Sequence, residues 1–477
     1  MAQSPQRKLF LGPRLRRLRR DLGLTQTRMA EDLGVSPSYL NYLERNQRPV
    51  TAQVLLRLAE AYDIDIRSLS SDQDAADARD LSEVFADPLF RDLAVARHEV
   101  AEVAESAPGV ADAIVRLYHA YAGRRRLAEA GDLPRAEDGG EGLALTPSDW
   151  VRDYIQGQRN FFSELDEAGE ALAGELKAEP QGLAAAGRQR LLDRHGIQVR
   201  IVPLEVLPDS VRRYDHHRRR LMLSELLGEQ GRAFAIAYQL ALAEHDAELT
   251  AMSERAAAPD TPTRRLIKVS LANYLAAAVM MPYEAFREAC ERTSHDIELI
   301  GARFGASFEQ VCHRLTTLSR PTSRGVPFFM LRVDSAGNIS KRFAGASFPF
   351  SRFGGSCPRW RVHEAFRTPG RVITQMVETP DGARYFTLAR TTRGWPAPMP
   401  TPTRGLAIGL GCELKYAPRL IYSRGLDLAD PQVTEIGPAC RVCERPACPQ
   451  RAAEPLGRTL MVDDFTKSIS PYPFAPV

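Results

Sequence analysis

The amino-acid sequence predicts a mainly α-helical protein with α+β parts. Apolar residues recur at helical spacing through most of the first 320 residues, whereas two pairs of strand-like runs with turn residues between them follow in the last third. The length of 477 residues is enough for about three domains with cores of their own. We therefore expect an N-terminal helical bundle, a helical linker, a central α+β domain and a C-terminal α+β domain with antiparallel hairpins.

Two short helices joined by a tight turn are expected within residues 24–49, LTQTRMAEDLGVSPSYLNYLERNQRP. Gly34 suits the left-handed position that ends the first helix, and Ser36 followed by Pro37 suits the start of the second. This pattern predicts a helix-turn-helix, whose second helix enters the major groove of double-stranded DNA. The residues expected to contact DNA are polar or basic: Gln26, Thr27, Ser36, Ser38, Tyr39, Asn41, Arg45 and Arg48.

The N-terminus is strongly basic, although the net charge of the whole chain is only +3. Five arginines lie between residues 14 and 20, and no acidic residue precedes Asp21. Neutralisation of phosphates supplies most non-specific affinity for DNA, so this run fits a DNA-binding role better than the alternative of a solvated basic face. A helix-turn-helix gains affinity by reading two half-sites about 34 Å apart, which predicts a homo-oligomer.

The segment TQTRMAEDLGVSPSYLNYLERNQRPVT resembles the XRE family of bacterial regulators and is similar to phage repressors. The resemblance covers about residues 8–70, so we assign residues 1–70 to the DNA-binding domain. Residues 71–145, which include an acidic stretch and a Gly-rich loop, are expected to form a helical linker.

The composition predicts a cytoplasmic protein. No apolar run reaches the roughly 18 to 20 residues needed to span a bilayer, and no secretory pattern precedes the first helix, so no membrane partner is expected. Seven cysteines in a long cytosolic chain argue for free thiols or metal ligands rather than a disulfide framework.

Residues 146–320 are expected to form the central domain, with strands over 197–207 and 214–223 and apolar helices over 230–249 and 264–281. This order, with the helix ending ANYLAAAVMMP, resembles the ImmA/IrrE zinc peptidases. That family carries His-Glu-x-x-His on the first apolar helix. Here Ala237 and Ala241 stand at the two ligand positions and Tyr238 at the position of the base, and no carboxylate stands just before Ala272-Asn273.

We therefore expect no enzymatic activity, because Ala offers no donor to zinc. A degenerate cleft of this kind suits a ligand pocket, with Tyr238 projecting into it, and the alternative is that Ala237, Tyr238 and Ala241 only pack a core. Two other functions compete with a ligand-responsive regulator. One is a zinc-dependent peptidase acting on a repressor, and the other is an antitoxin-like DNA-binding protein whose C-terminal region binds protein.

Residues 321–477 are expected to form the C-terminal domain. Two hairpins are predicted, over 327–343 with a turn at 334–338 and over 371–392 with a turn at 380–382, and together they imply an antiparallel sheet.

A cluster of thiols follows the hairpins. Cys440, Cys443 and Cys448 lie within nine residues, Cys412 can supply a fourth thiolate, and Cys357 is the alternative fourth ligand. Thiolates at this density suit an iron–sulfur cluster or zinc. The spacing matches neither ferredoxin pattern, and a zinc ribbon would need a second Cys-x2-Cys pair, so we favour [4Fe–4S] with zinc as the alternative.

The chain resembles the short-chain fatty-acyl transcriptional regulators over essentially its full length. Three C-terminal segments carry this resemblance: RFGGSCPRWRVHEAF, GLAIGLGCELKYAPRLIYSRGLDL and IGPACRVCERPACPQRA. This resemblance also suggests the iron–sulfur cluster. It implies control of genes of propionate, acetate, methylcitrate or glyoxylate metabolism, with a short-chain acyl-CoA as effector and a cluster that senses redox state or holds its domain together.

By the same resemblance Arg159 and Tyr238 are the effector contacts, and Asn160 lines the site. Arg159 is expected within a helix, where it could hold a phosphate of the coenzyme. The alternative for Arg159 is an ordinary salt bridge to Asp153, Glu164 or Asp166.

Overall fold

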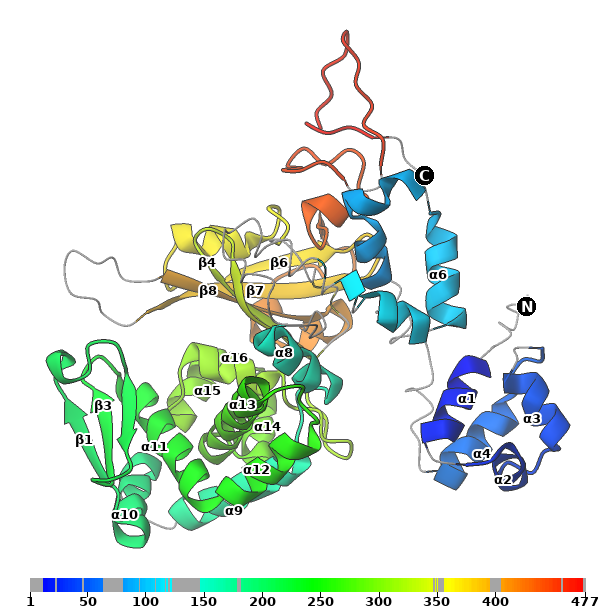
Figure 1. Ribbon diagram of the computed structural model, residues 1–477. Helices are drawn as coiled ribbons and strands as arrows, with labels where there is room; N and C mark the ends of the chain where they lie inside the picture. The colour runs from blue at the N-terminus through cyan, green and yellow to red at the C-terminus, as the bar shows by residue number, and fades with distance from the viewer. Residues whose placement is uncertain are drawn as a thin grey trace, which may run out of the picture. The chain divides into compact units, whose positions relative to one another are not determined.

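The computed structural model describes residues 12–21, 24–44, 47–62, 80–93, 95–107, 109–115, 117–118, 121, 146–177, 182–345, 348, 350, 356–394, 405–455 and 458–474. The chain divides into two compact units. Unit 1 comprises residues 1–144 with 456–459, and unit 2 comprises residues 145–455 with 460–477 (Figure 1). The predicted fold class, mainly α with α+β parts, is confirmed.

Unit 1 begins with four helices around one apolar core. They are α1 (Gly12–Asp21), α2 (Gln26–Asp32), α3 (Pro37–Glu44) and α4 (Ala52–Tyr62). Leu33, Leu40 and Leu43 are among the side chains buried between them, as their helical spacing predicts. A second small core in unit 1 includes Val84 and Val100 and involves η2 (Pro88–Leu93) and α6 (Arg97–Ser106).

Nine helices form the α-helical part of unit 2 within the described ranges. They are α8 (Pro147–Gly157), α9 (Ser163–Lys177), α10 (Leu183–His195), α11 (Glu229–Glu244), α12 (Asp246–Arg255), α13 (Thr261–Met280), α14 (Tyr283–Arg292), α15 (Ile297–Phe304) and α16 (Phe308–Leu315). Helix α13 is the central one, because it packs against α8, α9, α11, α12 and α16. The helix predicted over 230–249 is in fact two helices, since the backbone breaks at His245 between α11 and α12.

A small three-stranded sheet lies beside these helices. Its strands are β1 (Gln198–Val202), β2 (Arg212–Asp215) and β3 (Arg220–Ser224), in the order β1-β3-β2, and the turn η3 (Leu204–Val206) follows β1. The prediction of one strand over 214–223 is wrong, because residues 216–219 turn the chain back and pair β2 antiparallel with β3. Strand β3 also pairs with β1 in parallel.

The second sheet of unit 2 has six strands in the order β5-β4-β8-β7-β6-β9. They are β4 (Phe329–Asp334), β5 (Ile339–Ala344), β6 (Ile373–Glu378), β7 (Arg384–Arg393), β8 (Gly405–Glu413) and β9 (Thr434–Glu435). Both predicted hairpins are confirmed, with Gly337 and Gly382 at positive φ in their turns. Strand β8 was not predicted; it lies between the hairpins and joins them into one sheet. Short 3₁₀ turns connect the remaining chain: η4 (Arg361–Arg367), η5 (Leu414–Arg419), η6 (Ile421–Ser423) and η7 (Cys440–Val442).

The six-stranded sheet separates two apolar cores. On one face Leu388, Leu410 and Cys412 join the large core of the helices. On the other face Phe329 and Tyr385 pack with Trp360 and Cys357 in a core of their own. Side chains alternate between the two faces of a strand, so neighbouring positions of one strand belong to different cores.

Among the described residues, no single helix is long and apolar enough to cross a bilayer; α13 and α14 pass that test only when taken together, and the chain bends by 59° between them.

Candidate functional site

Helix α3, which we call the reading helix, and the preceding helix α2 are each capped by a hydroxyl side chain at their N-terminal end. The hydroxyl of Thr25 accepts the N–H of Arg28 at 3.2 Å, and the hydroxyl of Ser36 accepts the N–H of Tyr39 at 3.1 Å. Gly34 has φ +61°, as predicted for the end of α2. The guanidinium of Arg57 donates to the carbonyl oxygens of Leu33 and Gly34 at 2.8 and 3.1 Å, which ties the turn to α4.

The predicted DNA contacts form a surface at the start of α3. Ser36 and Ser38 are exposed, and Tyr39 and Asn41 are partly exposed. Thr27, on α2, and Arg48, which follows α3, are also exposed. Arg45 lies outside the described residues. These positions leave the side chains open to a major groove, and their contacts with DNA stay a prediction.

Gln26 has a second role that its sequence position does not reveal. Its side-chain amide donates to Asn41 at 3.4 Å and to Glu44 at 3.1 Å, so it links α2 to the reading helix. Glu44 is buried and also accepts two hydrogen bonds from Arg19, at 2.6 and 3.1 Å. Arg19 is therefore a structural residue of the bundle, while the neighbouring Arg16 is exposed.

The peptidase-like helix of unit 2 is α11. Ala237 and Ala241 are completely buried, and Tyr238 is nearly so. The guanidinium carbon of Arg212, from β2, lies 3.6 Å from the centre of the Tyr238 ring. This is a cation–π contact, and burial lowers the pKa of Arg212. The position of a catalytic base is thus occupied by an aromatic ring that carries a cation on one face.

The histidines near α11 do not replace the missing ligands. His245 contacts Glu248 in the next turn at 3.0 Å, and the ring of His216 packs at a tilt of 60° against Tyr214, with ring centres 4.9 Å apart. Lys268, on α13, pairs with Asp246 at 2.6 Å. Within the described ranges, no three His, Cys, Asp or Glu side chains are positioned to bind a metal ion.

Arg159 and Asn160 lie in the turn between α8 and α9. The prediction that Arg159 lies in a helix is wrong, because α8 ends at Gly157 and both residues have positive φ, +52° and +55°. Asn tolerates this left-handed conformation, whereas Arg adopts it rarely. Arg159 is exposed, and two of the carboxylates considered as its partners pair elsewhere: Glu164 with Arg255 and Asp166 with Arg314.

The side chain of Asn160 is only 2 % exposed, and within the described residues neither its amide nitrogen nor its oxygen has a hydrogen-bond partner. A buried, unpaired amide costs free energy, so the site calls for a polar partner that the described chain does not supply. Arg159 and Asn160 lie in the turn after α8 and Tyr238 lies on α11, so the three predicted effector contacts belong to one unit but to two different segments.

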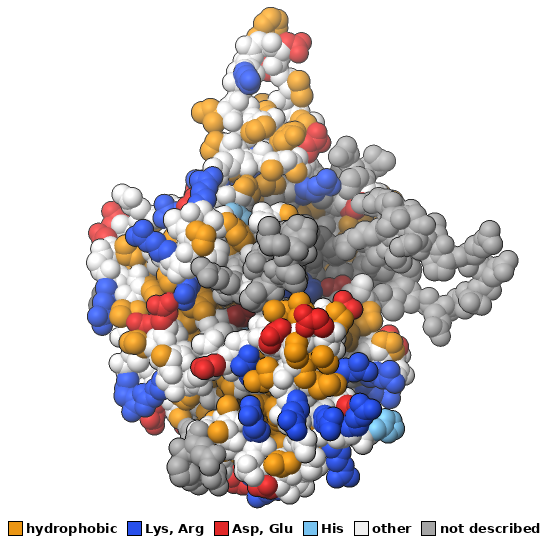
Figure 2. Space-filling view, turned by 90° about the vertical axis from the view of Figure 1, so that its left-hand side faces the viewer, with side chains coloured by type: hydrophobic (Ala, Val, Ile, Leu, Met, Phe, Trp, Pro, Cys, Tyr) orange, Lys and Arg blue, Asp and Glu red, His pale blue; other side chains and the backbone are white. Residues whose placement is uncertain are grey.

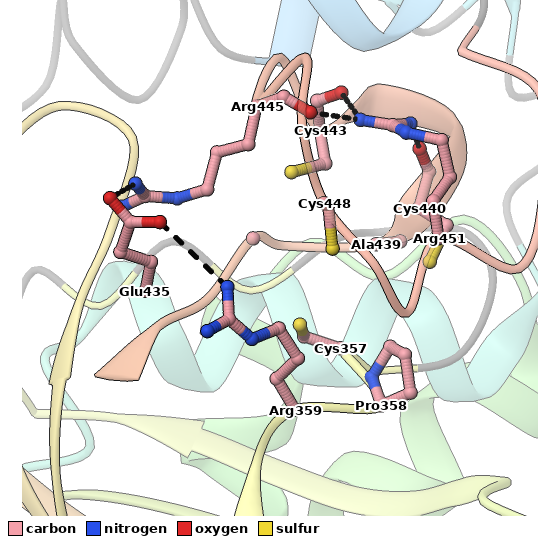
Figure 3. A pocket seen from close by; sticks show the side chains of 11 residues that line it. Cys357, Pro358, Arg359, Glu435, Ala439, Cys440, Cys443, Arg445, Cys448 and Arg451 are labelled. Atoms are coloured by element: carbon pink, nitrogen blue, oxygen red, sulfur yellow. Dashed lines mark hydrogen bonds and ion pairs between the residues drawn. The ribbon is translucent and has the colours of Figure 1, made fainter. Parts of the chain in front are cut away.

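Four thiols line a single pocket on the far side of the six-stranded sheet from the helices. Cys357, Cys440, Cys443 and Cys448 surround the same small space in Figure 3, and the free volume between them is about 10 Å3, room for about one water molecule. Burial raises the pKa of the Cys357 and Cys443 thiols. Any metal that binds here must therefore displace protons.

Cys412 is not part of this group, so its assignment as the fourth thiol is wrong. Its side chain points from β8 into the core shared with the helices, whereas Cys357 lies in the core on the other face of the sheet. Cys357, the alternative considered from the sequence, lines the pocket with the other three thiols. Burial raises the pKa of the Cys412 thiol to about 12, as expected for an inert core thiol.

The arginines around the pocket hold its backbone. Arg451 is 3 % exposed and donates to the carbonyl oxygens of Cys440 at 2.7 Å, Cys443 at 2.9 Å and Arg445 at 2.8 Å (Figure 3). Arg445 donates to the carbonyl oxygen of Glu378 at 2.9 Å and pairs with Glu435 at 2.7 Å. Arg451 and Arg445 therefore hold the backbone of the loop that carries three of the thiols.

A helix-turn-helix with an exposed second helix, a peptidase-like domain in which Ala237, Tyr238 and Ala241 stand at the metal and base positions, and a C-terminal domain with gathered thiols together indicate a DNA-binding transcriptional regulator. Comparison with known families agrees. Residues 15–69 match the helix-turn-helix family, residues 192–316 the IrrE N-terminal-like domain, and residues 317–472 the family described as "Short-chain fatty acyl coenzyme A regulator, C-terminal".

Similar proteins extend over almost the whole chain. The chain is 41 % identical to the HTH-type transcriptional regulator RamB of Mycobacterium tuberculosis over 470 residues, which cover 98 % of each protein. It is 39 % identical to the regulator PrpR of the same organism, with 98 % of this chain and 96 % of that protein covered. It is also 39 % identical to the propionyl-CoA carboxylase regulator of Cereibacter sphaeroides, with 98 % of each covered.

A solved structure of a Mycobacterium tuberculosis transcriptional regulator is 41 % identical, covers 68 % of this chain and 99 % of its own, and superposes with a TM-score of 0.65. The chain therefore belongs to the short-chain fatty acyl coenzyme A regulators, a family of helix-turn-helix transcriptional regulators.

Proposed function

We propose that this regulator controls genes of short-chain fatty acid metabolism by binding a short-chain acyl-CoA, propionyl-CoA first among them, in unit 2. Two names support this choice: one relative is called a propionyl-CoA carboxylase regulator, and the matching C-terminal family is described as a short-chain fatty acyl coenzyme A regulator. The observation that carries the proposal is Asn160, whose buried amide has no hydrogen-bond partner in the part of the chain that the structure describes, next to the exposed guanidinium of Arg159.

A second cation supports an anionic effector. Arg212 is partly buried and lies on the ring of Tyr238, and no ion pair of Arg212 is found among the described residues. A guanidinium in this setting is stabilised when an anion binds to it, because arginine can form two parallel hydrogen bonds with a phosphate. Arg159 and Arg212 would hold phosphates of the coenzyme, Asn160 would hydrogen-bond the ligand, and Tyr238 would offer its hydroxyl.

Binding controls DNA affinity only if the acyl-CoA has different affinities for two states of the protein. The experiment is a calorimetric titration of the full chain with propionyl-CoA, acetyl-CoA, butyryl-CoA and free coenzyme A. We expect saturable binding of at least one acyl-CoA, and weaker binding by Arg159→Ala, Arg212→Gln and Tyr238→Phe. Arg218→Ala, at an exposed position in the β2–β3 turn, is the matched control.

No saturable binding of any acyl-CoA would overturn the sensor proposal and favour the antitoxin-like alternative. The peptidase alternative makes a different prediction, namely stoichiometric zinc bound to residues 146–320 and loss of a repressor substrate on incubation with the protein.

We also propose that the four-thiol pocket holds a [4Fe–4S] cluster, with zinc as the alternative. The donor set Cys357, Cys440, Cys443 and Cys448 fits both, because thiolates bind zinc and iron–sulfur clusters. As the four side chains stand, no three of them are positioned to hold a metal ion, so a cluster or zinc requires the 440–448 loop to rearrange, and Cys440 and Cys448 are partly exposed on that loop. The bound cluster would supply one-electron redox chemistry, while Arg451 holds the backbone of the loop.

Anaerobic purification distinguishes the two metals. A brown protein with iron and acid-labile sulfide in equal amounts, whose visible absorbance bleaches on reduction, is the expected result. A colourless protein with one zinc per chain would overturn the cluster proposal and show that the pocket binds zinc.

A further inference from the structure

An apolar arm projects from unit 2 close to its C-terminal end. We define the arm as residues 460–474. Its two ends meet at an isolated bridge between Leu460 and Phe474, and the N–H of Met461 donates to the carbonyl of Pro473 at 2.9 Å. Figure 1 shows the arm as the red loop that extends away from the body of unit 2. Its base is fixed, since Arg451 lies over the ring of Phe474 at 4.8 Å.

The outer part of the arm exposes large apolar side chains. Phe465 is 99 % exposed, Val462 84 %, Ile469 83 % and Met461 57 %. Hydrophobic side chains are visible over the projecting part in Figure 2. One phenylalanine buries about 150–250 Å2 when it is covered, and apolar surface gathered in this way marks an interaction site. The arm is therefore suited to insert into another surface.

A groove of complementary character lies in the helical part of the same unit. Its volume is about 290 Å3, and it is lined by apolar side chains from α10, α13, α14 and α15 together with three charged ones. The lining residues are Leu183, Met280, Ala285, Glu288, Arg292, Arg303 and Phe304. Figure 1 shows these helices at the opposite end of unit 2 from the arm, so an arm does not reach the groove of its own chain.

The arm and the groove have net charges of opposite sign, although within the groove Arg292 lies 3.8 Å from Glu288. The arm carries Asp463, Asp464 and Lys467 around Phe465, which gives two negative charges and one positive. The groove carries Arg292, Arg303 and Glu288, which gives two positive charges and one negative. Complementary charges of this kind fix the register of an interface and reject wrong partners.

We propose that the arm of one copy docks into this groove of a second copy of the chain. Phe465 fills the apolar part of the groove, Asp463 and Asp464 face Arg292 and Arg303, and Lys467 faces Glu288. Two-fold symmetry makes the exchange reciprocal, so both arms and both grooves are used and the assembly closes as a dimer. Two copies are also what a helix-turn-helix needs to read two half-sites. This inference does not depend on the acyl-CoA or the thiol ligand.

The dimer is tested on the full chain by sedimentation velocity over a range of protein concentrations. We expect wild type to dimerise and Phe465→Ser to weaken dimerisation by at least about tenfold, the effect of losing one buried aromatic side chain. Because Phe465 is fully exposed, the variant keeps its fold. Val206→Ser, at another position that is 53 % exposed in unit 2, is the matched control and leaves dimerisation unchanged.

A charge exchange tests the groove itself. Arg303→Glu and Asp464→Arg should each weaken the dimer, and the double variant should recover most of the loss because the two charges are reversed together. The proposal is overturned if wild type is monomeric at every concentration, if Phe465→Ser dimerises like wild type, or if Arg303→Glu has no effect. In the last case the arm binds elsewhere, on a partner's arm or on a different protein.

Discussion

The carboxylate of Asp166 accepts a hydrogen bond from the guanidinium of Arg314 at the centre of unit 2, where the two residues are 0 % and 1 % exposed. The other carboxylate oxygen accepts from the hydroxyl of Tyr274 at 2.7 Å. Arg314 also donates to the carbonyl of Met281 at 3.0 Å and to the hydroxyl of Thr317 at 3.1 Å. This network joins α9, α13 and the end of α16, so it fastens the helices under the six-stranded sheet.

Replacing Asp166 by Asn should destabilise unit 2 by about 3–5 kcal/mol, because it leaves the Arg314 charge buried without its partner. Urea unfolding followed by tryptophan fluorescence reports on this unit, since Trp150 and Trp360 belong to it. Glu164→Gln breaks the exposed pair with Arg255 and should cost less than about 1 kcal/mol. Equal losses of unfolding free energy in Asp166→Asn and Glu164→Gln would contradict the central role of the buried Asp166–Arg314 pair.

The thiols should separate into ligands and core residues. Cys357→Ser is expected to lose most of its bound iron or zinc, and Cys412→Ser is expected to keep it, because only Cys357 lines the pocket. Metal analysis and visible absorbance of anaerobically purified proteins provide the measurement. A protein that keeps its metal without Cys357 and loses it without Cys412 would show that our correction is mistaken.

Base reading and phosphate binding should respond differently in unit 1. Asn41→Ala should cost about 1–3 kcal/mol of discrimination against altered operators, whereas Arg48→Gln should weaken binding to all sequences and lower the salt dependence by about one phosphate contact. Fluorescence anisotropy with specific and scrambled duplexes at several salt concentrations separates the two effects. Asn41 is bonded to Gln26, so circular dichroism of Asn41→Ala must show an intact bundle.

The stability of unit 2 should fall as the pH drops from about 7 to 5.5. His295 is 2 % exposed, and burial lowers its pKa, so it is neutral in the folded protein while the unfolded chain takes up a proton below about 6.5. The folded state is therefore most stable at a pH above the pKa of this histidine in the unfolded chain. That stability is lost as the pH falls towards the lower pKa of His295 in the folded protein. Each such histidine adds a slope of up to about 1.4 kcal/mol per pH unit.

Replacing His295 by Leu should flatten that slope, whereas the exposed His217→Leu should leave it unchanged. Urea unfolding by tryptophan fluorescence at pH 7.0, 6.2 and 5.5 gives the slopes. A His295 variant whose stability still falls as steeply as wild type would assign the effect to other histidines, such as His313, whose pKa burial lowers to about 3.

Local patterns in the sequence predicted the local structure well. Gly34, Ser36 and Pro37 fixed the helix-turn-helix, and the turns at Gly337 and Gly382 fixed both hairpins, because each feature depends on residues a few positions apart. Strand β8 is a short apolar run without a hairpin partner next to it in sequence. Its place between β4 and β7 depends on pairing with distant segments, which a local pattern does not contain.

The candidate sites were harder to predict for the same reason. Sequence spacing favoured Cys412 and kept Cys357 as the alternative, and only the face of the sheet on which each side chain lies separates them. Arg212 gave no signal, since one arginine among RRYD looks like any solvated strand residue until β2 is placed beside α11. Arg159 was expected in a helix because Gly157 was not read as its end.

Arg451 donates to three backbone carbonyl oxygens, and this affects which residues of the 440–448 loop can be substituted among related proteins. Every residue type has a backbone carbonyl, so Arg451 recognises the path of the 440–448 loop and not the side chains along it. Substitution of the exposed Arg441 should therefore be tolerated, provided that the three cysteines and Arg451 persist together. The loop can change its surface, and hence what it meets in solution, without changing its shape.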